Sequence, residues 1–160
     1  MARVLALIYR LSKLFNFVAE AALTFMMFLT VADVILRSLR RPIVGTYELV
    51  AFSGAVVIGF SIPLTSWMRG HVWVDIITSK CSRKTREVLN VATRCLVIAL
   101  FITAGWKLIK YGLNLQRVKE VSMTLQMPFY PVAYGLGLCC FAQCLVIFSD
   151  ILKISGGEYE

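Results

Sequence analysis

Four long apolar stretches dominate the pattern of hydrophobic and polar positions along the chain. They cover residues 14–36, 47–68, 88–113 and 129–152, with approximate limits. A helix needs about 20 mostly apolar residues to cross the hydrocarbon core of a bilayer, and each stretch meets that requirement. The segments between them are short and carry most of the charge, so none could bury a core of its own. The pattern predicts an all-α integral membrane protein with a single membrane domain, residues 1–160, and four transmembrane helices.

Two further segments have an amphipathic pattern and are expected to form short interfacial helices. In the first, at the N-terminus, Arg3, Arg10 and Lys13 would lie on the polar side. Arg10 and Lys13 also interrupt the apolar run that a secretory signal would need, so we expect this segment to be retained. The second segment is Gly70-His71-Val72-Trp73-Val74-Asp75, which follows the second span. Its His71 and Asp75 would either face headgroups or a partner protein, or cap the end of the second span.

Composition agrees with a membrane protein and argues against a nucleic-acid partner. Hydrophobic residues make up 59% of the chain and charged residues 16%, compared with about 25% in soluble domains. The net charge is +8, but the basic residues cluster beside the spans and form no groove interleaved with aromatic residues. Clusters of this kind indicate which side of the membrane each loop occupies. With both termini in the cytoplasm, ten basic residues lie inside and seven outside, which favours that orientation.

The residue types available for chemistry point away from an enzyme. The single histidine, His71, lies outside the spans, so no pair of axial haem ligands exists. His71 and Asp75 could share one face of a helix, but two ligands do not make a structural zinc site. The five cysteines form no C-x-x-C motif and are interpreted as packing residues. We expect no catalytic residues, no metal site and no cofactor in this chain.

Charged residues inside the spans are expensive and are therefore candidates for a function. Glu20 and Arg94 lie at similar depth in the first and third spans and are expected to form an ion pair, with Asn16 and Lys13 as competing partners of Glu20. The same two charges support an alternative function, a self-sufficient homo-oligomeric channel or small transporter whose path they would line.

A second intramembrane pair and two stripes of small residues are also apparent. Asp33 precedes Arg37 by one helical turn, the favourable order for an intrahelical ion pair. Small residues recur every four positions around Gly59 in the second span and around Gly137 in the fourth. Because small residues let helices approach closely in lipid, these faces are expected to contact other helices.

Three short motifs occur in order on this four-span background: Gly45-Thr46-Tyr47-Glu48-Leu49 at the start of the second span, Gly70 to Asp75 after it, and Ser122-Met123-Thr124-Leu125-Gln126-Met127-Pro128 before the fourth. Together they resemble the small (Q-type) membrane subunit of tripartite ATP-independent periplasmic (TRAP) transporters, over nearly the whole chain.

That resemblance implies a sodium-coupled uptake system of the bacterial inner membrane, in which a periplasmic binding protein delivers an organic anion, such as a C4-dicarboxylate or sialic acid, to two membrane subunits. The large (M-type) subunit would carry the transport path and the sodium sites. The small subunit would act as a scaffold bound along the fixed part of the large subunit, with an outer face that helps to dock the binding protein.

The resemblance also assigns subunit-contact or scaffold roles to individual residues, namely Glu48, Gly70, His71, Asp75, Ser122 and Pro128. As a carboxylate at the outer interface, Glu48 would orient Arg40, Arg41 or a donor of a partner subunit. Substrate-binding residues are not expected in this chain.

Overall fold

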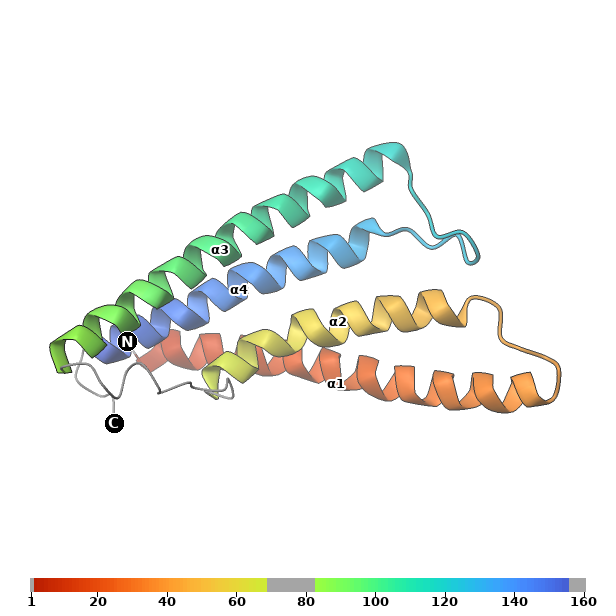
Figure 1. The fold of residues 1–160 in the computed structure, drawn as a ribbon, viewed down its shortest axis with the longest axis horizontal. Coiled ribbons are helices and arrows are strands. Elements are labelled where there is room, and N and C mark those ends of the chain that lie inside the picture. The colour runs from red at the N-terminus through yellow and green to blue at the C-terminus, as the bar shows by residue number, and fades with distance from the viewer. Residues whose placement is uncertain (1, 69–82, 156–160) are drawn as a thin grey trace.

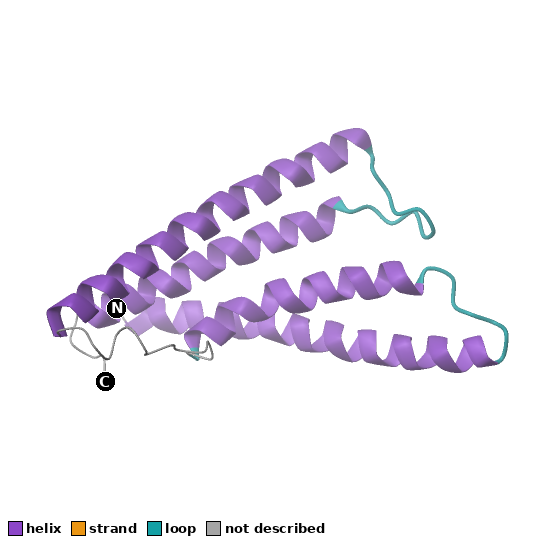
Figure 2. Cartoon of the chain, in the orientation of Figure 1, coloured by secondary structure: helices purple, strands orange, loops and turns teal. Residues whose placement is uncertain are grey.

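The computed structural model describes residues 2–68 and 83–155, which form four α-helices (Figure 1). Their bounds are Ala2–Ser38 for α1, Thr46–Trp67 for α2, Arg83–Val118 for α3 and Tyr130–Ser155 for α4. Every one of them contains a segment long and apolar enough to cross a membrane. Described residues outside the helices belong to short loops and turns (Figure 2). The predicted all-α fold with four candidate spans is confirmed.

The helices form two antiparallel hairpins, α1 with α2 and α3 with α4, which are joined mainly through α4 (Figure 1). α4 packs along α3, along α2 and more lightly against α1. It is accordingly the most enclosed helix. In its apolar stretch of 18 residues, 44% of the residues are buried, compared with 6–17% in the corresponding stretches of the other three helices. The two connecting loops, residues 39–45 and 119–129, lie at one end, here named the loop end. α1 begins and α4 ends at the opposite, terminal end.

The predicted N-terminal boundary differs from the structure. We expected a separate interfacial helix before a span starting near residue 14, but α1 continues unbroken from Ala2 to Ser38. Residues 2–13 contain neither glycine nor proline, the residues that most readily end a helix, so no local signal separates the two segments. The other predicted interfacial segment, residues 70–75, lies outside the described residues.

Close approach of the helices depends on glycine, as the stripes of small residues predicted. A Cβ atom at Gly59 on α2 would overlap the side chain of Leu136 on α4. A Cβ at Gly137 on α4 would lie 3.1 Å from Cγ1 of Ile109 and 3.4 Å from the carbonyl oxygen of Gly105, both on α3. Each glycine therefore contacts another helix of this same chain, and the resulting van der Waals packing is what holds helices together in lipid.

Aromatic contacts fix the register of the first hairpin. Phe15 on α1 meets Phe60 on α2 edge to face, with ring centroids 5.4 Å apart, and Tyr9 meets Trp67 with centroids 5.8 Å apart. Phe15 also packs with Cys139 and Ala142 of α4 in a small buried cluster. The N-terminal part of α1 is thereby placed beside the C-terminal part of α2.

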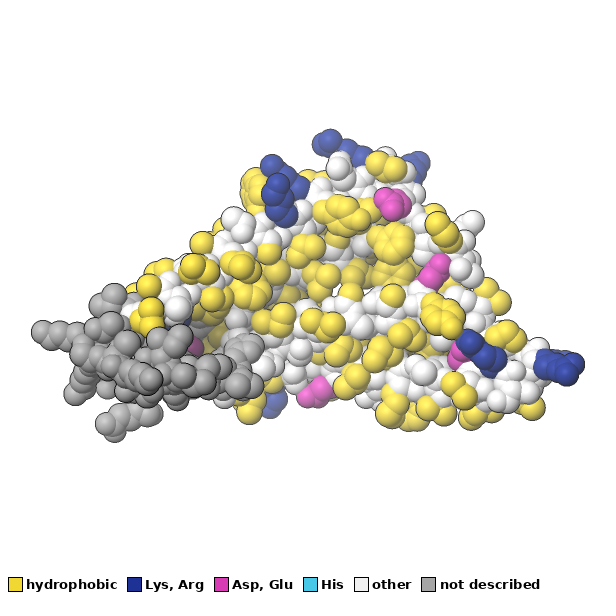
Figure 3. Space-filling model, in the orientation of Figure 1, with side chains coloured by type: hydrophobic (Ala, Val, Ile, Leu, Met, Phe, Trp, Pro, Cys, Tyr) yellow, Lys and Arg dark blue, Asp and Glu magenta, His cyan; other side chains and the backbone are white. Residues whose placement is uncertain are grey.

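Apolar side chains are spread across the described part of the face seen in Figure 3, and the Lys and Arg side chains visible there lie toward its outline. Large hydrophobic residues are exposed along every helix, among them Phe17, Ile58, Leu96 and Leu138, each 58–68% exposed. A surface of this kind suits hydrocarbon, or other transmembrane helices, and not water.

Candidate functional site

At the loop end, the Glu48 carboxylate joins the two hairpins. Oε2 accepts hydrogen bonds from the Ser122 hydroxyl at 2.7 Å and from the backbone N–H of Leu125 at 2.9 Å, while Oε1 accepts one from the backbone N–H of Thr124 at 2.7 Å. Glu48 belongs to the first turn of α2, whereas its three donors belong to the α3–α4 loop. One side chain therefore ties together segments that are 74 or more positions apart in the sequence.

The α3–α4 loop is shaped to present these donors. Ser122 donates its hydroxyl to Glu48 and accepts a hydrogen bond from the Met127 N–H at 3.1 Å, and its own N–H bonds to the Met127 carbonyl at 2.9 Å. A β-bridge between Val121 and Pro128 closes the same loop. Two successive backbone N–H groups are thus directed at one carboxylate, as in other anion-binding turns. Hydrogen bonds to an ionised acceptor are shorter and stronger than those between neutral groups.

Gly45 brings the two loops into direct contact. It precedes α2 with φ of 81°, a left-handed conformation that only glycine adopts readily, and its carbonyl accepts the N–H groups of Glu48 and Leu49. A Cβ at this position would overlap the side chain of Leu125, so the α3–α4 loop occupies the space that any other residue at position 45 would need for its side chain. Phe52 and Phe129 extend the contact toward the membrane, with ring centroids 5.1 Å apart.

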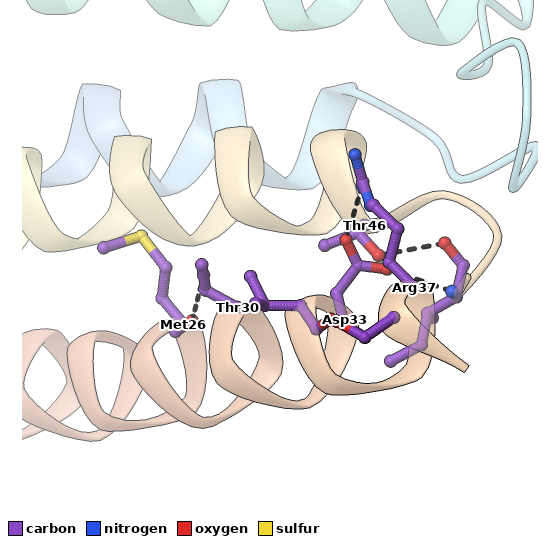
Figure 4. A network of polar contacts seen from close by, with 8 residues as sticks. Met26, Thr30, Asp33, Arg37 and Thr46 are labelled. Atoms are coloured by element: carbon purple, nitrogen blue, oxygen red, sulfur yellow. Dashed lines mark hydrogen bonds and ion pairs between the residues drawn. The ribbon is translucent and has the colours of Figure 1, made fainter. Parts of the chain in front are cut away.

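A second carboxylate, Asp33, fixes the loop between α1 and α2 (Figure 4). Its Oδ2 accepts a hydrogen bond from Arg37 Nη2 at 2.6 Å, and its Oδ1 accepts one from the backbone N–H of Ile43 at 3.0 Å. Asp33 is only 4% exposed. Thr46, at the start of α2, donates its hydroxyl to the Ile43 carbonyl at 3.0 Å. The predicted Asp33–Arg37 pair is therefore present, and it also holds the loop.

The outer surface of the loop end combines apolar tips with basic side chains. Met123 is 100% exposed, Tyr47 78% and Val118 73%. The Arg37 guanidinium lies 5.8 Å from the centre of the Tyr47 ring. Further basic residues of this end are Arg40, Arg41, Arg117 and Lys119. The loop end therefore exposes apolar side chains with basic residues nearby, a combination common at protein-binding surfaces.

The structure corrects two predicted pairings. Glu48 does not bind Arg40 or Arg41, because its oxygens are engaged by Ser122 and the loop N–H groups. Glu20 and Arg94 are not partners either. Glu20 Oε1 instead accepts a hydrogen bond at 2.5 Å from Asn16, one of the two competing partners predicted for it, and Arg94 on α3 forms an ion pair with Asp150 on α4 at 4.0 Å.

The remaining predicted site residues have different outcomes. Ser122 lies in the Glu48 contact and Pro128 in the β-bridge that closes the loop. Gly70, His71 and Asp75 lie outside the described residues. Among the side chains that the structure describes, no group of three or more His, Cys, Asp or Glu residues is placed to hold a metal ion.

The sequence did not predict the polar contacts between different helices in the terminal half of the bundle. Gln143 on α4 donates a hydrogen bond to the Ser66 hydroxyl on α2 at 2.6 Å, and both residues are buried. Asp150 was also missed as the partner of Arg94. A full count of the polar residues in the fourth apolar stretch would have singled out Gln143 and Asp150 as residues that need partners in a membrane.

Taken together, the exposed apolar helix surfaces and the two hydrogen-bonded loops define a small helical membrane component. A family model for the DctQ component of tripartite ATP-independent periplasmic transporters matches residues 26–155. The chain therefore belongs to the DctQ family, the small component of TRAP transporters. No curated protein and no solved structure matches it.

Proposed function

We propose that this chain is the scaffold subunit of a sodium-coupled, binding-protein-dependent TRAP transporter that takes up an organic anion such as a C4-dicarboxylate or sialic acid. The large subunit would carry the substrate path and the sodium ions, and this chain would hold it in the bacterial inner membrane. Both termini would be cytoplasmic, so that the loop end faces the periplasm.

The observation that carries the scaffold role is the Glu48 contact. Three hydrogen bonds from one loop, together with the packing of Leu125 on Gly45, link the α1–α2 hairpin to the α3–α4 hairpin at the end farthest from the chain termini. Such a joint limits relative motion of the hairpins. A fixed reference surface is what a moving transport subunit would need beside it.

The same joint supports a docking role for the loop end. The exposed Met123 and Tyr47 side chains are carried by segments that Glu48 and Asp33 hold in place. Around them, the basic side chains favour a partner with an acidic face, because complementary charge accelerates encounter and selects orientation. We assign that partner as the periplasmic binding protein.

A reconstitution experiment tests this proposal. Vesicles would contain the large subunit alone, this chain alone, or both, and uptake of a labelled carboxylate would be measured with binding protein and an inward sodium gradient. Uptake that requires both chains and sodium supports the proposal. Flux through vesicles that contain only this chain would contradict it and support the alternative, a self-sufficient channel or transporter.

A further inference from the structure

Glu20 is the only charged residue in a long apolar stretch of α1. Between Lys13 and Asp33, residues 14–32 contain no other charged side chain. At about 1.5 Å per residue these positions span roughly 28 Å, close to the thickness of a hydrocarbon core. Glu20 lies seven positions from Lys13, or roughly 10 Å along the helix axis, and is farther still from Asp33. Its carboxylate therefore lies inside the membrane.

The helix register supports this depth. Phe15 contacts Phe60, and Asp33 bonds to Ile43 just before α2, so the stretch of α1 that contains Glu20 runs beside the middle of α2. At that level Ala19 is buried at 3% exposure, while Glu20 is exposed. Successive helical residues are about 100° apart, so Glu20 lies on a flank of α1 and not in its contact with α2.

The contacts of Glu20 within the chain do not neutralise its charge. Asn16, one turn earlier, donates a single hydrogen bond to Oε1, and this amide carries no charge. No ion pair joins Glu20 to another described residue, in contrast to Asp33 with Arg37 and Asp150 with Arg94. Nor can the short side chain of glutamate extend to the headgroups as a lysine side chain does.

Large apolar side chains surround the carboxylate on the same flank. Phe17 is 67% exposed, Leu23 49% and Met27 55%. Thr24, also exposed, bonds only to the Glu20 backbone carbonyl. The flank therefore offers one negative charge within an apolar surface, at a depth where an uncompensated charge is strongly unfavourable.

We infer that a transmembrane helix of the large subunit covers this flank of α1 and presents a lysine or arginine side chain to the Glu20 carboxylate. Charge complementarity identifies the occupant, because lipid chains provide no cation and a second copy paired symmetrically through this flank would bring its own Glu20, since residues 14–32 contain no cation. This inference rests on the proposed function, and it adds the residue through which the large subunit is recognised within the membrane.

The test measures how much large subunit is recovered with this chain. Tagged wild-type chain and the variants Glu20→Leu, Glu20→Gln and Glu120→Gln would each be coexpressed with the large subunit and purified in mild detergent. Glu20→Leu should reduce the recovered ratio of large subunit at least about tenfold, because it leaves the partner's cation buried and unpaired. Glu20→Gln, which keeps a hydrogen-bond acceptor, should reduce it less. Glu120→Gln removes a carboxylate from the exposed α3–α4 loop and should change nothing.

Two further measurements separate recognition from folding. The isolated Glu20→Leu chain should melt no lower than wild type, because the exposed side chain it replaces has no packing role. A photo-crosslinking amino acid in place of Phe17, about 60° around α1 from Glu20, should capture the large subunit. The same probe in place of Phe25, which is 50% exposed and about 140° from Glu20, should capture less.

The possible failures are distinguishable. If wild-type chain recovers no large subunit at all, the proposed function is wrong. If wild-type chain recovers it and the Glu20 variants recover it equally well, only this inference is wrong. Crosslinks from position 17 to a second copy of this chain, or to lipid alone, would also overturn it.

Discussion

The substitution Gly45→Ala would test the joint between the two loops most sharply. Gly45 has φ of 81°, and a methyl group there would overlap the Leu125 side chain. A non-glycine residue in the left-handed region costs roughly 1–2 kcal/mol, and forcing extra volume into a packed contact typically costs about 1–3 kcal/mol. The free energy of unfolding should therefore fall by about 2–5 kcal/mol.

The assay is equilibrium unfolding of the detergent-solubilised chain, followed by circular dichroism during titration with a denaturing detergent. Gly54→Ala is the matched control, because Gly54 lies within α2 and a Cβ there would meet nothing within 4 Å. That variant should be neutral or more stable by up to about 1 kcal/mol, the difference in helix propensity. In a Leu125→Ala background the overlap disappears, so Gly45→Ala should then cost only the backbone part, roughly 1–2 kcal/mol.

Equal stabilities of the Gly45→Ala and Gly54→Ala chains would refute the reasoning, because they would mean that neither the backbone conformation nor the loop contact matters. An undiminished effect of Gly45→Ala in the Leu125→Ala background would refute the packing part alone. In that case the loops would not be coupled through this contact.

Three other substitutions probe different contacts. Glu48→Gln places an amide NH₂ against the loop donors, so it should lower the thermal midpoint of the solubilised chain and the uptake by the reconstituted complex. The control Glu120→Gln should alter neither, and equal midpoints of the two variants would contradict the role of the Glu48 carboxylate. Gln143→Leu removes the buried hydrogen bond to Ser66 and should destabilise the chain by about 0.6 kcal/mol, and by no more than about 1.7 kcal/mol, in detergent titration, the average and the maximum for interhelical hydrogen bonds in membranes. Gly105→Leu inserts a side chain where even a Cβ would lie 3.3 Å from a carbonyl oxygen of α4. Crosslinking of α3 to α4 through engineered cysteine pairs should therefore become less efficient, and unchanged efficiency would argue against this close approach.

The fold was largely predictable because the bilayer imposes a length and a polarity on each span. The four helices appear where the apolar stretches lie, and the Asp33–Arg37 pair follows from helical spacing within one element. Hydropathy could not show that α1 begins at Ala2, because a helix that leaves the membrane needs no change in backbone conformation.

The candidate site was only partly predictable because its contacts are not local. Glu48 and Ser122 were both singled out, but the binding of Thr124 and Leu125 to Glu48 is made by backbone N–H groups that sequence patterns do not reveal. Likewise, similar depth suggested Arg94 as the partner of Glu20, whereas the packing of α3 on α4 brings it to Asp150. Depth limits the candidates for a pair, but helix packing decides among them.

Purification from native membranes tests most directly whether this chain works as an accessory subunit. The tagged chain would be extracted in mild detergent, and its partners and their stoichiometry determined by native mass spectrometry. We expect a larger multi-span subunit in one-to-one ratio with this chain. Recovery of this chain only with copies of itself, in a defined oligomer, would contradict the account.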